Sequence, residues 1–165
     1  MLWDGESSDF EFADDEALYF RVQPENFFKH QGQLRINSAA IQLPDKSVNR
    51  SKGGGRAEFA RHNAYPGCNG MCNGRHHSWT VARIEAKDVC VGLHHQPEDV
   101  FFHTKPVHDP LKYNRFHTEI RAFDSQEQHI DPKHLEKLGR NAHLRWSRRV
   151  ARYAQVVIAG DMRQD

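Results

Sequence analysis

Four segments between Ser78 and Phe123 alternate apolar with polar residues, and this alternation restricts the possible folds more than any other feature. The segments are SWTVARI, VCVGLHH, DVFFHTK and NRFHTEIRAF, with short polar connections between them. Alternation with a period of two is typical of strands that bury one face, as with Val89, Val91 and Leu93. Short connections favour antiparallel pairing, because parallel neighbours need long crossovers. The sequence therefore predicts a mainly antiparallel sheet.

An apolar stripe near the C-terminus predicts one long helix that packs on this sheet. Asp131 and Pro132 are a favourable helix start, with Asp at the cap and Pro in the first turn. Apolar residues then recur at spacings of three and four: Leu135, Leu138, Ala142, Trp146, Val150 and Tyr153. We expect an α+β fold, in which a mostly antiparallel sheet carries a long C-terminal helix on one face.

The rest of the chain is expected to complete a single domain behind an acidic lead-in. A length of 165 residues suits one domain. Residues 1–16 are acidic and are predicted to be poorly ordered, so the α+β domain should span residues 17–165. ALYFRV at 17–22 and VVIA after the helix are predicted strands, and RINSAAIQL a further extended segment. PENFFKHQGQL is expected to form a turn or short helix, and DKSVNRSKGGGR at 45–56 a loop.

Composition favours a cytoplasmic location. No apolar run approaches the ~18 residues of a membrane-spanning helix. The acidic start lacks the charged-then-apolar layout of a signal peptide. Three cysteines cannot all pair within one chain, which fits free or metal-bound thiols better than a secreted disulfide scaffold. We therefore expect no membrane partner, and the oligomeric state stays open.

Two of the predicted strands contain the same Phe-His-Thr triplet, at 102–104 and 116–118. If they pair as a hairpin centred on Pro110, His103 lies opposite His117. One face of the hairpin then carries the ionisable residues His103, Lys105, His117, Glu119 and Arg121. The other face is expected to meet the helix stripe through Val100, Phe102, Thr104, Phe116, Thr118 and Ile120.

The ionisable face has the residue types that cleave RNA without a metal. The reaction needs a base for the 2′-hydroxyl proton, an acid for the leaving oxygen and a cation for the developing phosphorane charge. We assign His117 or Glu119 as the base, His103 as the acid, and Arg121 with Lys105 as the cations. These side-chain types resemble those of metal-independent endoribonucleases, whose sites often lie on a sheet face. The simpler alternative is an ordinary solvated strand face, which also alternates polar residues.

The segment CNGMCNGRHHSW, residues 68–79, is a second candidate site. Cys68 and Cys72 are separated by three residues, which lets two thiolates converge on a metal, and His76 or His77 would be the third ligand. A fourth would come from His62, Cys90, His94 or His95. We predict a structural zinc ion, because the segment has few apolar residues with which to build a core. The alternatives are free thiols in an Asn-Gly turn, a local disulfide, or a Cys72 packed in the core.

Cationic side chains cluster in two further places. Arg50, Lys52 and Arg56 surround a run of three glycines whose backbone amides are able to cradle a phosphate. Four arginines of the C-terminal helix fall outside its apolar stripe and predict contacts with nucleic-acid phosphates: Arg145, Arg148, Arg149 and Arg152. A flexible surface loop and a solvated helix face are the simpler interpretations.

Two hypotheses about function follow. The first is a nucleic-acid-processing domain, with RNA as its partner, that cleaves RNA at the ionisable sheet face. The second is a non-catalytic, zinc-stapled subunit of a larger assembly, whose basic helix and acidic lead-in bind protein or nucleic acid. Polar groups that converge in a cleft favour the first hypothesis, and a flat charged surface favours the second.

Overall fold

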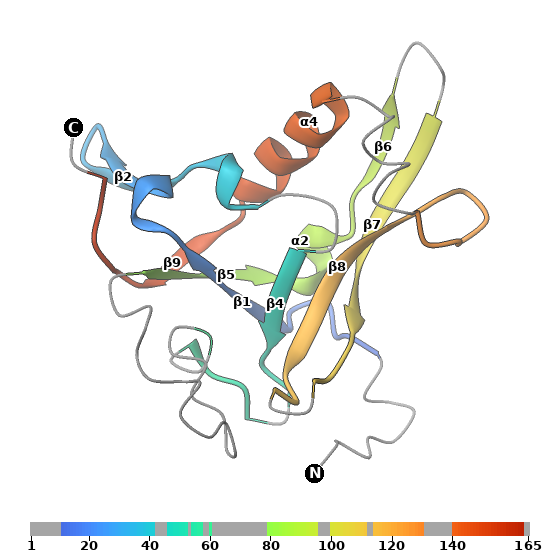
Figure 1. The fold of residues 1–165 in the computed structure, drawn as a ribbon, viewed down its shortest axis with the longest axis horizontal. Coiled ribbons are helices and arrows are strands. Elements are labelled where there is room, and N and C mark those ends of the chain that lie inside the picture. The colour runs from blue at the N-terminus through green and yellow to red at the C-terminus, as the bar shows by residue number, and fades with distance from the viewer. Residues whose placement is uncertain are drawn as a thin grey trace.

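A seven-stranded sheet is the centre of the computed structural model, which describes residues 11–41, 46–52, 54–57, 60, 79–95, 100–111, 114–130 and 140–163 (Figure 1). Its strands have the order β6-β7-β8-β4-β1-β5-β9, and all the neighbouring pairs are antiparallel. The described helices are few and short. A mostly antiparallel sheet with few helices agrees with the predicted class.

Most strands form where the alternating segments predicted them. Their bounds are Ala17–Val22 for β1, Thr80–Glu85 for β5, Gly92–His95 for β6, Val100–His108 for β7, His117–Phe123 for β8 and Gln155–Ile158 for β9. In β1 the alternate residues Leu18, Phe20 and Val22 are buried in the core, as the pattern requires. Val89 departs from the prediction, because it lies in the short helix α2, Ala86–Val89, rather than in a strand.

Strand β4, Lys46–Arg50, lies in the middle of the sheet, where the sequence predicted a loop. It pairs with β1 on one side and with β8 on the other. Its one strongly β-forming residue is Val48, which is buried in the core. Residues 46–50 therefore form a strand because they pair with both β1 and β8, although their own preference for β structure is weak.

A separate two-stranded hairpin replaces the turn-or-helix segment and the extended segment predicted after β1. It consists of the 3₁₀ turn η2, Pro24–Asn26, the strands β2, Phe27–His30, and β3, Gln33–Ile36, and the 3₁₀ turn η3, Ser38–Ala40. Gln31 and Gly32 connect the strands with φ angles of 48° and 78°. Positive φ at both central residues is the signature of a type I′ turn. The Gly in this turn therefore makes the hairpin, rather than ending a helix.

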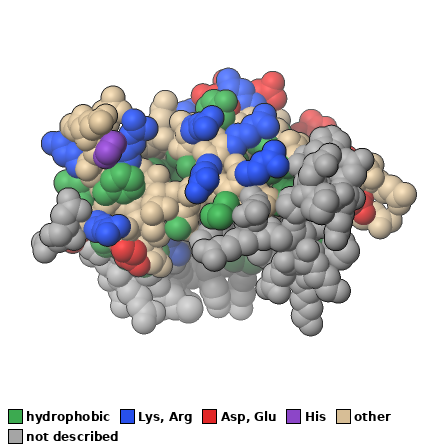
Figure 2. Space-filling model, turned by 90° about the horizontal axis from the view of Figure 1, so that it is seen from above, with side chains coloured by type: hydrophobic (Ala, Val, Ile, Leu, Met, Phe, Trp, Pro, Cys, Tyr) green, Lys and Arg blue, Asp and Glu red, His purple; other side chains and the backbone are tan. Residues whose placement is uncertain are grey.

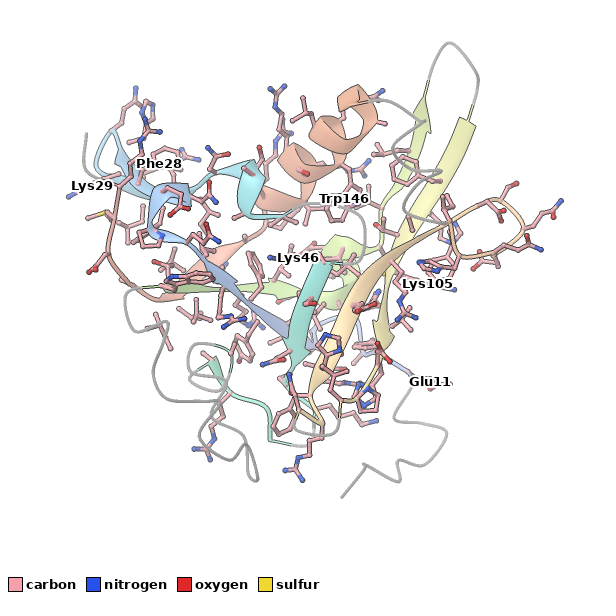
Figure 3. All side chains as sticks on the ribbon, in the orientation of Figure 1. Glu11, Phe28, Lys29, Lys46, Lys105 and Trp146 are labelled. Atoms are coloured by element: carbon pink, nitrogen blue, oxygen red, sulfur yellow. The ribbon has the colours of Figure 1, made fainter. Side chains whose placement is uncertain are left out.

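The helix α4 is described over Arg140–Ala151, and residues 131–139, where the long helix was predicted to begin, lie outside the described residues. Trp146 points from α4 toward the sheet (Figure 3), and its Nε1 donates a hydrogen bond to Thr104 Oγ1 at 2.9 Å. Ala142 and Val150 are buried beside it, as the stripe predicts. Tyr153 lies beyond the helix end and is 52% exposed. None of the described helices is long and apolar enough to cross a membrane.

Candidate functional site

The β7–β8 hairpin has a register that differs from the predicted one. His103 lies opposite Phe123, and Lys105 lies opposite Arg121, so the expectation that His103 faces His117 is wrong. The reason is that β7 continues to His108 and the chain turns beyond Pro110, where a bridge joins Leu111 to Asn114. His103 is displaced from His117 by six positions along β8, which is about 20 Å. Because the displacement is an even number of residues, each residue keeps its predicted face.

His103 and Lys105 form a surface group of their own around Glu127. His103 Nε2 lies 3.0 Å from Glu127 Oε1, and Lys105 Nζ lies 2.9 Å from Glu127 Oε2. Both side chains also contact the ring of Phe123. The hydrogen bond from Lys105, followed by the one from His103, lowers the pKa of Glu127. This end of the hairpin is a solvated ion-pair group that does not reach His117.

Four side chains converge where β8 begins, and we call them the β8 cluster: Asp109, His117, Glu119 and Arg121. Arg121 donates from Nε to Glu119 Oε2 at 2.8 Å and from a terminal nitrogen to Asp109 Oδ2 at 3.2 Å. His117 is only 9% exposed, whereas the Arg121 side chain is 27% exposed. The cluster is therefore buried at the imidazole and open to solvent at the guanidinium.

The alternation of β8 places three of these side chains on one sheet face, at positions 117, 119 and 121. Strand β4 adds Ser47, which pairs with Glu119, and Asn49, which pairs with His117. The face therefore gains a hydroxyl and an amide from the strand that the sequence predicted as a loop.

The imidazole of His117 is held in one tautomer. Its Nδ1 lies 2.7 Å from the backbone carbonyl of Asp109, and its Nε2 lies 3.3 Å from Ser47 Oγ. A carbonyl oxygen only accepts hydrogen bonds, so Nδ1 carries a proton. The exchangeable position is therefore Nε2, on the side of the ring that faces Ser47.

A pair of asparagines fixes the turn that carries Asp109. Asn114 Nδ2 donates to Asn49 Oδ1 at 2.9 Å, and Asn114 Oδ1 accepts from the amide of Phe116 at 3.1 Å. The amide of Asp109 donates to the carbonyl of His117 at 3.1 Å. These bonds tie the turn to both β4 and β8, so the Asp109 carboxylate has a fixed place beside Arg121.

Asp109, His117 and Glu119 could also hold a metal ion. One ligand atom from each lies within 4.8 Å of the others. Two carboxylates and an imidazole form a mixed oxygen and nitrogen set that suits several divalent ions. The guanidinium of Arg121 already bridges the two carboxylates. A bound cation would therefore take over the charge neutralisation that Arg121 provides.

The predicted zinc ligands Cys68, Cys72, His76 and His77 lie outside the described residues, so the structural zinc site stays a prediction. One proposed fourth ligand, Cys90, is described, and its Sγ donates to the carbonyl of Ala86 at 3.3 Å. Partial burial, followed by the charge of Asp14, raises the pKa of the Cys90 thiol. A raised pKa disfavours the thiolate that zinc requires.

Arg50 belongs to the fold, and its guanidinium does not face an open phosphate site. The residue is 2% exposed, and its Nε and a terminal nitrogen donate to the two Glu16 carboxylate oxygens at 2.8 and 2.9 Å. The same terminal nitrogen donates to the carbonyl of Glu11 at 2.8 Å. Phe12 covers the guanidinium, with its ring centroid 4.0 Å from Cζ. Residues 11–16 are thereby attached to the sheet.

In the glycine run, the described backbone amides donate hydrogen bonds within the chain. Gly54 and Gly55 both donate to the carbonyl of Ser51, at 3.3 and 3.1 Å. These two amides are not directed at a ligand, which weakens the phosphate-cradle interpretation. Lys52 and Arg56 lie exposed beside this turn.

The arginines assigned to the C-terminal helix are exposed, and Lys and Arg side chains gather on the side of the molecule that carries α4 (Figure 2). They are Arg145, Arg148 and Arg149 within the helix and Arg152 directly after it. This surface lies on the helix-covered side of the sheet, opposite the β8 cluster.

Sequence reasoning missed Ser47, Asn49, Asp109 and Asn114. A signal for the first two was present, because KSVNR places Ser47 and Asn49 two residues apart, which is the spacing of one strand face. Asp109 and Asn114 were hidden in the connection PVHDPLKYN. No family model, curated protein or solved structure matches this chain.

Proposed function

We propose that this chain is a nucleic-acid-processing domain that cleaves RNA at the β8 cluster. The observation that carries the proposal is the convergence of a carboxylate, an imidazole and a guanidinium on one sheet face. A base, an acid and a cation are the groups that attack by a 2′-hydroxyl requires. This chemistry needs no further reactant.

Each group takes one step of the reaction. Glu119 accepts the 2′-hydroxyl proton while the bond from O2′ to phosphorus forms. The imidazolium form of His117 gives its Nε2 proton to O5′ while the bond from phosphorus to O5′ breaks, which leaves a neutral ring with its proton on Nδ1. The products are a 2′,3′-cyclic phosphate and a 5′-hydroxyl, and exchange with water restores both groups. Arg121 stabilises the phosphorane, because its guanidinium is a cation that is partly exposed to solvent.

The roles differ from those expected from the sequence in one respect. His103 was the expected acid, but it lies about 20 Å from His117 along the strand. The acid role therefore passes to His117, whose ring the Asp109 carbonyl holds in place. The base role, left open between two residues, falls to Glu119, because His117 takes the acid role and Glu119 is the neighbouring carboxylate on the same strand face.

A cleavage assay with matched histidine variants tests the proposal. The substrate is an end-labelled single-stranded RNA in buffer with EDTA, and mass spectrometry identifies the product ends. We expect His117→Gln and Glu119→Gln each to lower the rate by about 10²–10⁴-fold. His103→Gln, on the same sheet face but outside the cluster, should retain the parent rate. No cleavage by the parent, or an equal loss in His103→Gln, would contradict the proposal.

The close approach of Asp109, His117 and Glu119 supports a second candidate, a hydrolytic site that works with a divalent metal. The same assay separates the two. Activity that EDTA abolishes and Mn²⁺ or Zn²⁺ restores would favour the metal-dependent site. A rate that EDTA leaves unchanged would favour acid–base cleavage.

A further inference from the structure

A groove of about 730 Å³ lies between the β2–β3 hairpin and the end of α4. Its walls come from β2 and β3, from η3, from the last turn of α4 and from the start of β9. The groove therefore lies between two parts of the chain that are about 110 residues apart in the sequence, the hairpin around Arg35 and the helix end around Arg148. It lies on the helix-covered side of the sheet and shares no residue with the β8 cluster.

The lining of the groove has one sign of charge. Arg35 comes from β3, and Arg148 and Arg152 come from the opposite wall. All three side chains are exposed, and no carboxylate occurs among the described residues that line the groove. Arg148 and Arg152 form no ion pair with any residue that the structure describes. Three arginine side chains thus line one shared groove, whose positive charge favours an anion.

The groove also offers groups that contact bases. Phe28 lies half-buried at its hairpin side (Figure 3), where an aromatic face is available for stacking. Gln155 presents an amide, which pairs with base edges as both donor and acceptor, and Asn37 adds amide donors while its Oδ1 accepts from the amide of Ala39. An acidic peptide needs only the arginines, whereas unstacked bases also stack on an aromatic ring.

We infer that this groove binds single-stranded RNA. The arginines would hold successive phosphates, and Phe28 and the amides would contact unstacked bases. The inference goes beyond the proposed function, because the groove lies on the opposite side of the sheet from the β8 cluster and shares no residue with it. Its test measures binding alone, so that a failure of cleavage and a failure of binding are separate results.

Fluorescence anisotropy with a labelled 2′-O-methyl RNA of mixed sequence tests the inference, because such RNA lacks the nucleophile for cleavage. Each phosphate contact with a single strand contributes about 0.7 to the slope of log affinity against log salt. One contact is therefore worth about 8-fold in affinity at 50 mM salt relative to 1 M. We expect R148Q and R152Q each to lose about 8-fold at 50 mM salt, and Phe28→Leu about 5-fold or more.

Arg149 was one of the four arginines predicted to contact phosphates, but it does not line the groove, so it is removed from the proposed binding site and provides the matched control. It is exposed on the same helix but does not line the groove, so R149Q removes the same charge without removing a groove contact. R149Q should keep nearly the parent affinity, and circular dichroism should show the same melting temperature for all the arginine variants. Losses in R149Q equal to those in R148Q and R152Q would overturn the inference, because they indicate only diffuse surface charge. Poly-glutamate that competes as well as the RNA would overturn it in favour of an acidic protein.

Discussion

The substitution Glu16→Gln should destabilise the fold more than most single changes, because it removes the negative charge that offsets the buried guanidinium of Arg50. The Glu16 and Arg50 side chains are 6% and 2% exposed, and two hydrogen bonds of 2.8 and 2.9 Å join them. Glutamine keeps the shape of the side chain and one oxygen acceptor. It removes the negative charge that offsets the guanidinium.

The expected loss is about 3–5 kcal/mol of the free energy of unfolding, the range measured when one partner of a buried pair is removed. A total stability of about 5–15 kcal/mol makes this a large fraction. Replacing both partners should recover most of the loss, since the double variant Glu16→Leu with Arg50→Met buries no charge. The carbonyl of Glu11 and the amide of Lys52 then each lose a hydrogen bond, so we expect a residual cost of about 2 kcal/mol.

Urea denaturation followed by tryptophan fluorescence measures both variants. At an m-value of about 2 kcal/mol/M, Glu16→Gln should lower the midpoint by about 2 M at an unchanged slope. A midpoint within about 0.5 M of the parent would refute the reasoning, as would a double variant less stable than Glu16→Gln. If the single variant does not fold, the double variant still decides. A truncation of the acidic lead-in should therefore stop before Glu11, because residues 11–16 also supply the Glu11 carbonyl and the Phe12 ring that contact Arg50.

Two further predictions concern the buried polar groups of the sheet. Burial, followed by the charge of Arg21, lowers the pKa of Lys46 from 10.5 to about 8, so folded Lys46 releases its proton between pH 8 and 10.5 while the unfolded chain keeps it. Lys46→Met should therefore be more stable than the parent at pH 7, by at most about 3 kcal/mol of the free energy of unfolding. This difference should shrink from pH 8 to 10.5, because folded Lys46 then loses its unfavourable charge. Urea titrations that show the same difference at every pH would contradict the pKa shift. Thr104→Val removes the acceptor of the Trp146 indole, which should cost about 1–3 kcal/mol by thermal denaturation, and Thr104→Ser should retain most of that stability.

The strands that the sequence predicted best are those whose own residues strongly favour β structure. β1 has aromatic and β-branched residues at alternating positions, and burial of Leu18 and Phe20 needs no particular partner. Strand β4 could not be found this way, because KSVNR has one β-branched residue. Its position depends on pairing with His117–Phe123, which lies about 70 residues away in the chain. A prediction from the local sequence pattern does not include the hydrogen bonds to a partner strand that is distant in the chain.

The β7–β8 hairpin shows which features of the candidate site the alternation of residues can predict. Alternation assigned Glu119 and Arg121 to one face, and that assignment survives any even shift in register. The register itself depends on where the chain turns, which here follows from the bridge between Leu111 and Asn114. The sequence could therefore predict which residues of the two hairpin strands share the polar face, but it could not predict the β4 residues on that face or the distance between His103 and His117.

The two arginines Arg50 and Arg121 show why cation counts alone do not locate a binding site. Both donate to carboxylates at similar distances, and a sequence presents them as equivalent charges. Arg50 is enclosed, and releasing Glu16 would leave two buried charges uncompensated, so no substrate can replace that partner. Arg121 is partly exposed and holds two carboxylates, so it can give up its longer contact to Asp109 and still remain paired with Glu119. A phosphate that approaches from solvent meets a cation whose partner it can replace, and this difference in burial makes Arg121 the better candidate for chemistry.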